Sequence, residues 1–173
     1  MKHCTSRLPQ VVEFAVPIPP QAPVSPSVEA VGAHMFAADR ASRGLGMRIV
    51  ALGAGTARLE MTVHDAMLNG HDICHGGFIT MLADSAFAYA CNSRNQLTVA
   101  AGLTVEFLVP VRRGDVLTAD AVEVSLAGRT GVYDMVVTNQ DGVRVALVRG
   151  RSASLRGRTV MPVAGEGAKE RVA

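Results

Sequence analysis

The sequence has no tryptophan and few other aromatic residues, five phenylalanines and two tyrosines in 173 positions. Its core must therefore consist mainly of valine, leucine, alanine and methionine. Charged residues are also scarce, at 18% of the chain against about 25% in an average soluble domain. Apolar residues make up 49%. This composition excludes disorder throughout, and the length fits one domain with its own core.

Cysteine is scarce as well. Cys4, Cys74 and Cys91 are odd in number and show no CxxC spacing, which disfavours a disulfide framework and a four-thiolate zinc site. A reducing cytoplasm is the expected compartment. No run of 18 apolar residues occurs, so no membrane span is expected. A net charge of +2 argues against nucleic acid as the main partner.

Prolines are concentrated at one end, with six of the eight in the first 26 residues. They interrupt any signal-peptide core, so export is not expected. This distribution predicts a Pro-rich flexible arm over residues 1–27 and a folded domain over residues 28–156. Residues 157–173 show little periodic pattern and are predicted to form a flexible tail.

The middle of the chain shows both helical and strand periodicity. Ser27 is a candidate cap for a short helix that carries Val31 and Met35 on one face. An apolar stretch over residues 78–91 predicts a helix that is buried on all sides. Alternating patterns predict strands over residues 46–52, 56–63, 116–126, 130–138 and 143–154, and another through Leu103 and Phe107. The fold class is therefore α+β, a mostly antiparallel sheet that wraps one long helix.

Asp84 is the only charged residue within the apolar helix. An unpaired carboxylate is costly to bury, so its presence there favours a functional role. Gly77, Thr80, Met81 and Ala88 are expected to share its helix face and to leave room for a thin ligand. The alternative is a structural aspartate that bonds a nearby loop or faces solvent.

Two glycines, Gly76 and Gly77, directly precede this helix and follow His75. Free backbone amides at a helix N-terminus can hold a developing oxyanion. Gly76 and Asp84 are eight residues apart, or about 12 Å along a helix. One chain cannot place both at one reacting atom. If they cooperate, Asp84 must meet the glycine amides of a two-fold partner.

The motifs Asn69-Gly70-His71, Cys74-His75-Gly76-Gly77 and the run over residues 82–93 resemble the signature of the PaaI family. These are hotdog-fold acyl-CoA thioesterases of phenylacetate degradation. Segments 130–134 and 145–150 also resemble family sequences. The resemblance implies a hotdog fold and hydrolysis of phenylacetyl-CoA, hydroxyphenylacetyl-CoA or related aryl or medium acyl-CoA thioesters. It implies a homodimer or homotetramer with sites shared between subunits, and no cofactor, since CoA is part of the substrate.

The resemblance also implies roles for individual residues. Asp84 would be the general base or the nucleophile at the thioester carbon, and Gly76 with Gly77 would supply the oxyanion donor. Asn69 would position the attacking water or the carboxylate. We interpret His75 as a group that fixes the glycine loop. No metal is required.

Other residue clusters support weaker interpretations. His64, His71, Cys74 and His75 are possible zinc donors, but their spacing matches no closed zinc site. Cys74 is a less favoured nucleophile than Asp84.

Arg129, Arg149 and Arg151 are candidates to bind the CoA phosphates. For any single arginine, a solvated sheet edge is the simpler interpretation.

The alternative function is a non-catalytic acyl-CoA-binding or regulatory hotdog module. A pure binder has no need for a carboxylate beside a thioester, which argues against it. An acyl-CoA hydratase of the same fold would need an Asp/His pairing that the sequence lacks.

Overall fold

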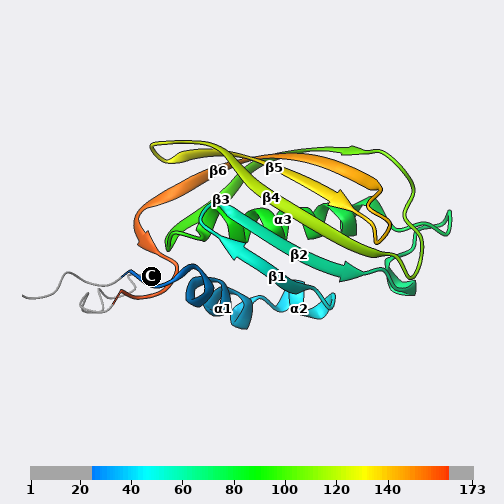
Figure 1. Ribbon diagram of the computed structural model, residues 1–173, viewed down its shortest axis with the longest axis horizontal. Helices are drawn as coiled ribbons and strands as arrows, with labels where there is room; N and C mark the ends of the chain where they lie inside the picture. The colour runs from blue at the N-terminus through cyan, green and yellow to red at the C-terminus, as the bar shows by residue number, and fades with distance from the viewer. Residues whose placement is uncertain (1–24, 164–173) are drawn as a thin grey trace, which may run out of the picture.

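The computed structural model describes residues 25–163, which form one sheet and the helices packed against it (Figure 1). The helices are α1 (Val28–Ala38), α2 (Arg40–Gly44) and α3 (Gly76–Asn92), with a 3-10 turn η1 at Asp65–Met67. The strands are β1 (Arg48–Gly53), β2 (Thr56–Thr62), β3 (Gln96–Phe107), β4 (Val116–Ala127), β5 (Thr130–Thr138) and β6 (Arg144–Thr159). No helix in this part of the chain is long and apolar enough to cross a membrane.

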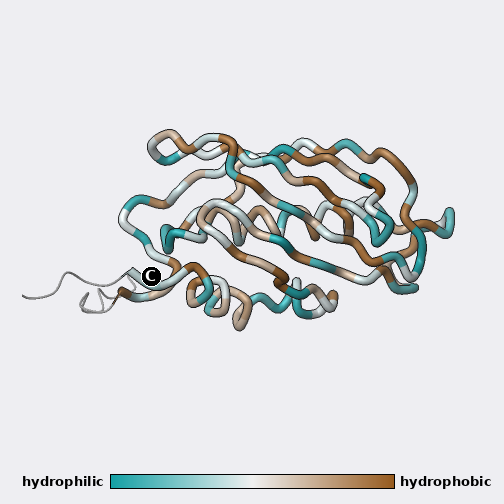
Figure 2. Tube along the Cα trace, viewed as in Figure 1, coloured by the Kyte–Doolittle hydropathy of each residue, from teal (hydrophilic) through white to brown (hydrophobic). Residues whose placement is uncertain are grey.

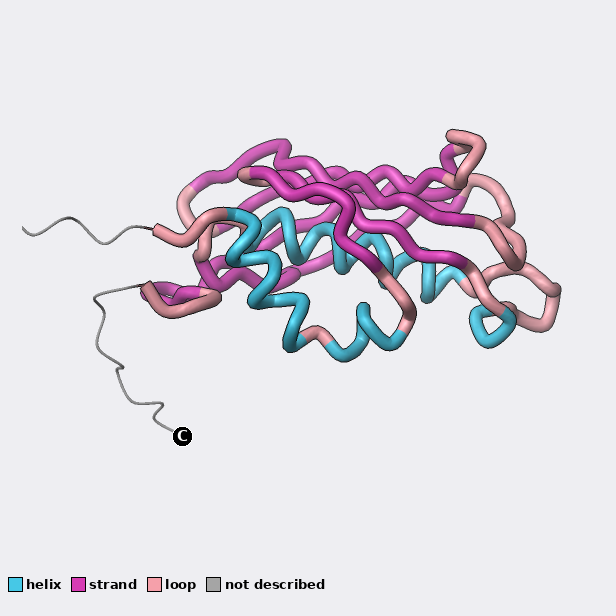
Figure 3. The backbone as a smooth tube through the Cα atoms, turned by 60° about the horizontal axis from the view of Figure 1, so that its bottom comes forward, coloured by secondary structure: helices cyan, strands magenta, loops and turns pink. Residues whose placement is uncertain are grey.

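The six strands form one antiparallel sheet in the order β1-β2-β4-β5-β6-β3. Short turns join β1 to β2 and β4 to β5, and Gly55 and Gly128 adopt the positive φ that such turns require. β3 follows α3 in the chain but pairs with β6, which makes it an edge strand opposite β1. The sheet curves over α3, the arrangement of a hotdog fold (Figure 3).

α3 lies against the concave face of the sheet and supplies the centre of the core. Leu82, Ala83, Ala86 and Ala90 are fully buried, and the small alanine side chains allow the helix to approach the strands closely. Apolar residues recur along the strands that cover it (Figure 2). The prediction of burial on all sides is wrong, however, because Thr80, Met81, Asp84, Ser85 and Ala88 are only half-buried. One stripe of α3 remains partly open.

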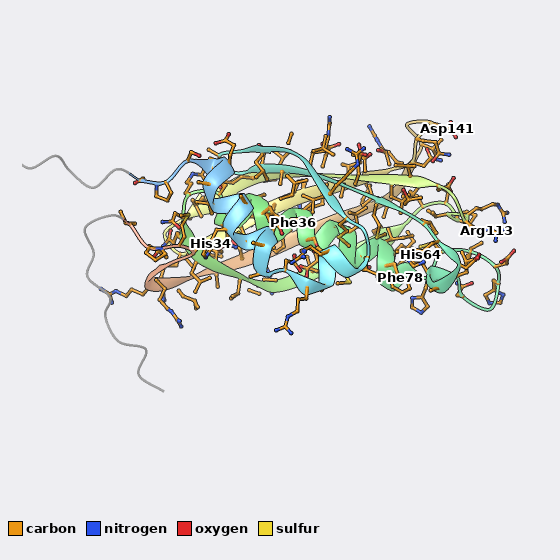
Figure 4. The ribbon with its side chains drawn as sticks, turned by 90° about the horizontal axis from the view of Figure 1, so that it is seen from below. His34, Phe36, His64, Phe78, Arg113 and Asp141 are labelled. Carbon is orange, nitrogen blue, oxygen red and sulfur yellow. The ribbon has the colours of Figure 1, made fainter. Side chains whose placement is uncertain are left out.

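α1 and α2 pack against α3 on the side away from the sheet (Figures 3 and 4). Ser27 caps α1 as predicted, since its Oγ accepts a hydrogen bond from the Ala30 N–H at 3.2 Å. α2 was not predicted from the sequence. Asp39 caps it by accepting from the Ser42 N–H at 3.0 Å, and five residues are too few to show a periodic pattern.

Several elements extend beyond their predicted ends. α3 begins at Gly76 instead of residue 78, because His75 caps it. β3 begins at Gln96, well before Leu103, and this early part pairs with the end of β6. β6 continues to Thr159, past the expected domain boundary at residue 156, and Gln96 lies opposite Thr159. The predicted arm lies mostly outside the described residues, as does the end of the predicted tail.

Candidate active site

The first turn of α3 is organised by His75. Its Nδ1 accepts a hydrogen bond from the Gly77 N–H at 3.0 Å, which satisfies one of the free amides at the helix start. The His75 N–H donates to the Met67 carbonyl at 2.8 Å and ties this turn to η1. A neutral imidazole that accepts at Nδ1 carries its proton on Nε2. His75 therefore acts here on the backbone of the turn.

Both glycines of the motif lie beneath close side-chain contacts. A Cβ at position 76 would lie 2.7 Å from Cζ of Phe107 at the end of β3. A Cβ at position 77 would lie 3.1 Å from Nδ1 of His75. The Phe107 ring covers Gly76, and the His75 ring covers Gly77. The glycine pair thus lets two side chains pack onto the backbone of α3.

The two amides differ in availability. The Gly77 N–H is engaged by His75, whereas the Gly76 N–H has no acceptor within residues 25–163. Gly76 lines a cavity of about 710 Å³ together with Phe107 and Asn69. The positive end of the α3 dipole points toward this space. Gly76 alone, and not the pair, presents a free backbone donor.

Asn69 lies in the same cavity, on the loop before α3. Its Oδ1 accepts from the His71 N–H at 2.9 Å, and its backbone N–H donates to the Ile73 carbonyl at 2.8 Å. These bonds close the loop around the side chain. The Nδ2 group finds no acceptor within the described residues. The Asn69 side chain therefore offers a free donor in the cavity that Gly76 also lines.

Asp84 lies two turns further along α3, in the half-buried stripe. Burial raises the pKa of its carboxyl above the ordinary value, and it forms no ion pair within residues 25–163. Asp84 lines a separate cavity of about 320 Å³ with Met35, Ala88 and Cys91. Part of the wall comes from Val99 and Ala100 on the edge strand β3. This cavity lies along the open edge of the sheet.

The structure thus places the candidate residues in two groups. Asn69, His75, Gly76 and Gly77 surround the start of α3, and Asp84 lies in another cavity about 12 Å along the helix. Figure 4 shows the two regions apart, with Phe78 at the start of α3 and Phe36 of α1 nearer its later turns. One subunit does not bring the carboxylate and the free amide together.

The expected neighbours of Asp84 are divided between these cavities. Thr80 and Gly77 line the cavity at Gly76, and only Ala88 lines the cavity at Asp84. Thr80 instead bonds the helix start, since its Oγ1 donates to the Gly76 carbonyl at 2.9 Å. Sequence reasoning missed Cys91 as a neighbour of Asp84. The helical spacing of residues 84, 88 and 91 would have identified it.

The thiols are unsuited to nucleophilic attack. Burial raises the pKa of Cys74 to about 11 and that of Cys91 to about 12, so both thiols stay protonated near neutral pH. Within residues 25–163, no three His, Cys, Asp or Glu side chains form a cluster that could hold a metal ion.

Two of the three candidate arginines, Arg149 and Arg151, lie on β6, and Arg129 lies in the turn between β4 and β5. Arg149 is engaged with Asp134 through two hydrogen bonds of 2.7 Å on the outer face of the sheet. Arg129 and Arg151 are exposed and have no acidic partner among the described residues. The Arg129 carbonyl accepts from the Ser154 N–H at 2.8 Å, which places its turn beside β6.

Comparison with known proteins places this chain in a class. The model of the thioesterase superfamily matches residues 71–146, which contain the glycine turn and all of α3. A Streptococcus mutans protein solved with bound acetyl CoA shares the fold at a TM-score of 0.63 and 26% identity, covering 65% of this chain and 91% of that one. The fold is that of a hotdog-fold thioesterase.

A narrower assignment follows from two further comparisons. The chain is 46% identical over 123 residues to the acyl-coenzyme A thioesterase PaaI of Escherichia coli, covering 71% of this chain and 88% of that protein. The structure of E. coli PaaI, from the phenylacetic acid degradation operon, matches at a TM-score of 0.75 and 43% identity over 76% of this chain and 95% of that one. The chain belongs to the PaaI family of the thioesterase superfamily and is an acyl-CoA thioesterase.

Proposed function

We propose that this enzyme hydrolyses phenylacetyl-CoA-type thioesters, hydroxyphenylacetyl-CoA included, or related aryl or medium acyl-CoA thioesters, to the free acid and CoA. The observation that carries the proposal is the half-buried Asp84 carboxylate, in a cavity whose other polar side chains, Asn92 and Thr98, are hydrogen-bonded within the protein. An unpaired carboxylate in such a place destabilises the fold, so a catalytic use accounts for it. The operon of the E. coli relative supports the phenylacetyl class.

In the proposed reaction Asp84 removes a proton from a water molecule as the water oxygen bonds to the thioester carbon. The raised pKa of Asp84 makes it a stronger base than an ordinary aspartate. The Gly76 N–H donates to the carbonyl oxygen as negative charge develops there. The C–S bond then breaks, and the departing CoA thiolate takes up the proton. Asn69 orients the water through its free Nδ2 group, and His75 holds the glycine turn.

We propose that each site is shared between two copies of the chain in a homodimer or a dimer of dimers. Asp84 and Gly76 lie in different cavities of one subunit, and the Asp84 cavity is walled by the edge strand β3. Val99 on that edge is 45% exposed. A second copy along this edge would cover the cavity and bring its own Gly76 to it. The two-fold axis generates two identical sites.

Arg129 and Arg151 are proposed to bind the CoA phosphates, because a free guanidinium pairs well with a phosphate. Arg149 could join them only by leaving Asp134. The reaction needs no cofactor, since CoA enters as part of the substrate. Cys74 and Cys91 are free and buried, which supports the reducing cytoplasm as the compartment.

The test is complementation between two inactive variants. Asp84→Asn removes the base, and Gly76→Pro removes the backbone donor at a position where helices tolerate proline. The variants are co-expressed with different tags, and hetero-oligomers carrying both tags are isolated. Released CoA thiol is measured with phenylacetyl-CoA.

Each variant alone is expected to be inactive, and the mixed dimer to recover about half of the wild-type rate, since one of its two sites is intact. A site contained in one subunit would leave every site of the mixed dimer with one lesion. Inactive hetero-oligomers would therefore contradict the shared site. An active Asp84→Asn protein would contradict the role of the carboxylate.

A further inference from the structure

Some residues that wall the cavity beside Asp84 are held rigidly in the core, and others can change conformation. If Asp84 acts at the thioester carbon, the acyl group attached to that carbon must lie in the adjoining space. Part of the wall is fixed: Phe87 is 1% exposed and its ring lies 5.2 Å from that of Tyr133. Phe87 also lies over Gly150, where a Cβ would be 3.0 Å from its ring. This side of the cavity cannot yield without disturbing the core.

The polar groups of the same wall are also fixed. The Asn92 Oδ1 accepts from the Thr98 N–H at 2.8 Å, and its Nδ2 donates to the Thr98 carbonyl at 2.8 Å and to the Ala88 carbonyl at 2.9 Å. The Thr98 hydroxyl donates to the Gln96 carbonyl at 2.9 Å. The donor groups of Asn92 and Thr98 are therefore already engaged within the protein. The cavity therefore suits an apolar acyl group.

Met35 enters this cavity from α1, an element outside the sheet and α3. The Met35 side chain is unbranched and flexible, so it can adapt its shape, whereas the fixed part of the wall cannot. Met35 is half-buried and packs against the core. It follows Gly32 by one turn on the inward face of α1, where Val31 is fully buried.

α1 itself is held by contacts on two sides, which limit its retreat from a bulky ligand. The Tyr89 hydroxyl donates to Asp39 Oδ2 at 3.2 Å, and the Phe36 and Tyr89 rings lie 6.4 Å apart. On the opposite side, a Cβ at Gly32 would lie 2.2 Å from Cδ1 of Leu52. Movement of α1 toward β1 would therefore require the Leu52 side chain to shift. The volume left for the acyl group then depends on the side chain at position 35.

We infer that Met35 determines which apolar acyl groups the enzyme accepts, by limiting the length of the acyl pocket. The inference rests on the proposed function, because it places the acyl group beside Asp84. A shorter side chain at position 35 enlarges the pocket, and a bulkier one shortens it. Met35 is a specificity-determining residue contributed by α1.

The experiment compares Met35→Ala and Met35→Phe with the wild-type enzyme on butyryl-, hexanoyl-, octanoyl- and phenylacetyl-CoA. One methylene in an apolar pocket is worth about tenfold or more in kcat/KM. Met35→Ala is expected to raise the octanoyl-to-butyryl ratio of kcat/KM by about tenfold, and Met35→Phe is expected to lower it. Two variants with opposite expectations keep the test decisive if one of them folds poorly.

Ile49→Ala is the matched control. Ile49 faces α1 from β1 across a different groove, which Phe36 and Ala37 also line. The substitution removes apolar contact with α1 without touching the Asp84 cavity. Its ratio is expected to equal that of the wild type. An altered ratio in Ile49→Ala would show that a loosened α1 is sufficient, and would overturn the inference, as would unchanged ratios in both Met35 variants.

A binding measurement separates this inference from the proposed function. S-butyl- and S-octyl-CoA thioethers cannot be hydrolysed, and calorimetry gives their affinities for each variant. If the wild type hydrolyses no acyl-CoA, the proposed function fails. The inference still stands if Met35→Ala shifts the thioether preference toward octyl. If neither thioether binds, or if the preference is unchanged in both Met35 variants, the inference fails as well.

Discussion

The start of α3 and the middle of α3 contribute to the proposed site in different ways. At the start, the functional group is a backbone amide, and the surrounding side chains bond and cover the turn. In the middle, the functional group is a single side chain that no neighbour neutralises, since Asp84 has no ion pair within the described residues. The first region is stabilised by its own hydrogen bonds and side-chain packing. The second is destabilised by burial of its carboxylate.

This difference explains why the two regions tolerate change differently. Removing one contact at the helix start leaves the other contacts in place, because His75, Phe107 and Thr80 each hold it separately. Removing the Asp84 carboxylate is expected to remove the proposed function of its region and to relieve an unfavourable burial.

The largest effect is expected from the contrast between Gly76→Pro and Gly76→Ala. Both add a Cβ against the Phe107 ring, but only proline removes the N–H. Proline suits the first position of a helix, and His75 has the extended ψ of 131° that a residue before proline adopts. We expect kcat to fall about 100-fold or more further in Gly76→Pro than in Gly76→Ala. Thiol-release kinetics on the two purified variants measure the difference.

Phe107→Ala combined with each substitution provides the control. Removing the ring relieves the close contact at 2.7 Å equally in both backgrounds, so the ratio between proline and alanine should persist. A ratio that disappears in the Phe107→Ala background would show that the packing of the ring, and not the amide, accounts for the loss.

A smaller effect is expected at His75. His75→Ala leaves the Gly77 N–H without its acceptor, and loss of such a cap costs about 1 kcal/mol. We expect a melting temperature about 2–4 °C lower and a roughly tenfold decrease in kcat, because the frayed turn misplaces the Gly76 amide. His75→Asn restores an N-cap oxygen and is expected to recover both quantities. Recovery of stability without activity would assign His75 a direct contact with the substrate.

The sequence alone was sufficient for the fold class, for the strand segments and for the family, because alternation, turn glycines and the 82–93 motif are local patterns. It did not predict which face of α3 stays open. That depends on where α1 and α2 pack, and α2 is too short to have a periodic signal. The early start of β3 at Gln96 was missed for a related reason, since its partner is the distant end of β6.

The candidate site was predicted unevenly for the same physical reason. Asp84 and the glycine pair are conspicuous in the sequence because they violate the local pattern of an apolar helix. The difference between the Gly76 and Gly77 amides is not evident from the sequence, because it depends on the rotamer of His75. The contribution of Met35 to the Asp84 cavity depends on the packing of α1 across α3. Tertiary contacts of this kind produce no recognisable pattern within a short stretch of sequence.

The smallest effect is expected in the stability of Asp84→Asn, and its sign tests the contrast directly. Burial raises the pKa of Asp84 in the folded state, so its contribution to stability is fully present below the unfolded pKa and is lost as the pH rises through the folded pKa. A neutral asparagine avoids this loss. Melting temperatures should therefore be higher for Asp84→Asn than for the wild type at pH 8, with the difference narrowing toward pH 4. Asp141→Asn, in an exposed turn far from α3 (Figure 4), is expected to show no such pH-dependent gain. A lower melting temperature for Asp84→Asn at pH 8 would mean that the carboxylate stabilises the middle of α3, and the two regions would then not differ in the way described.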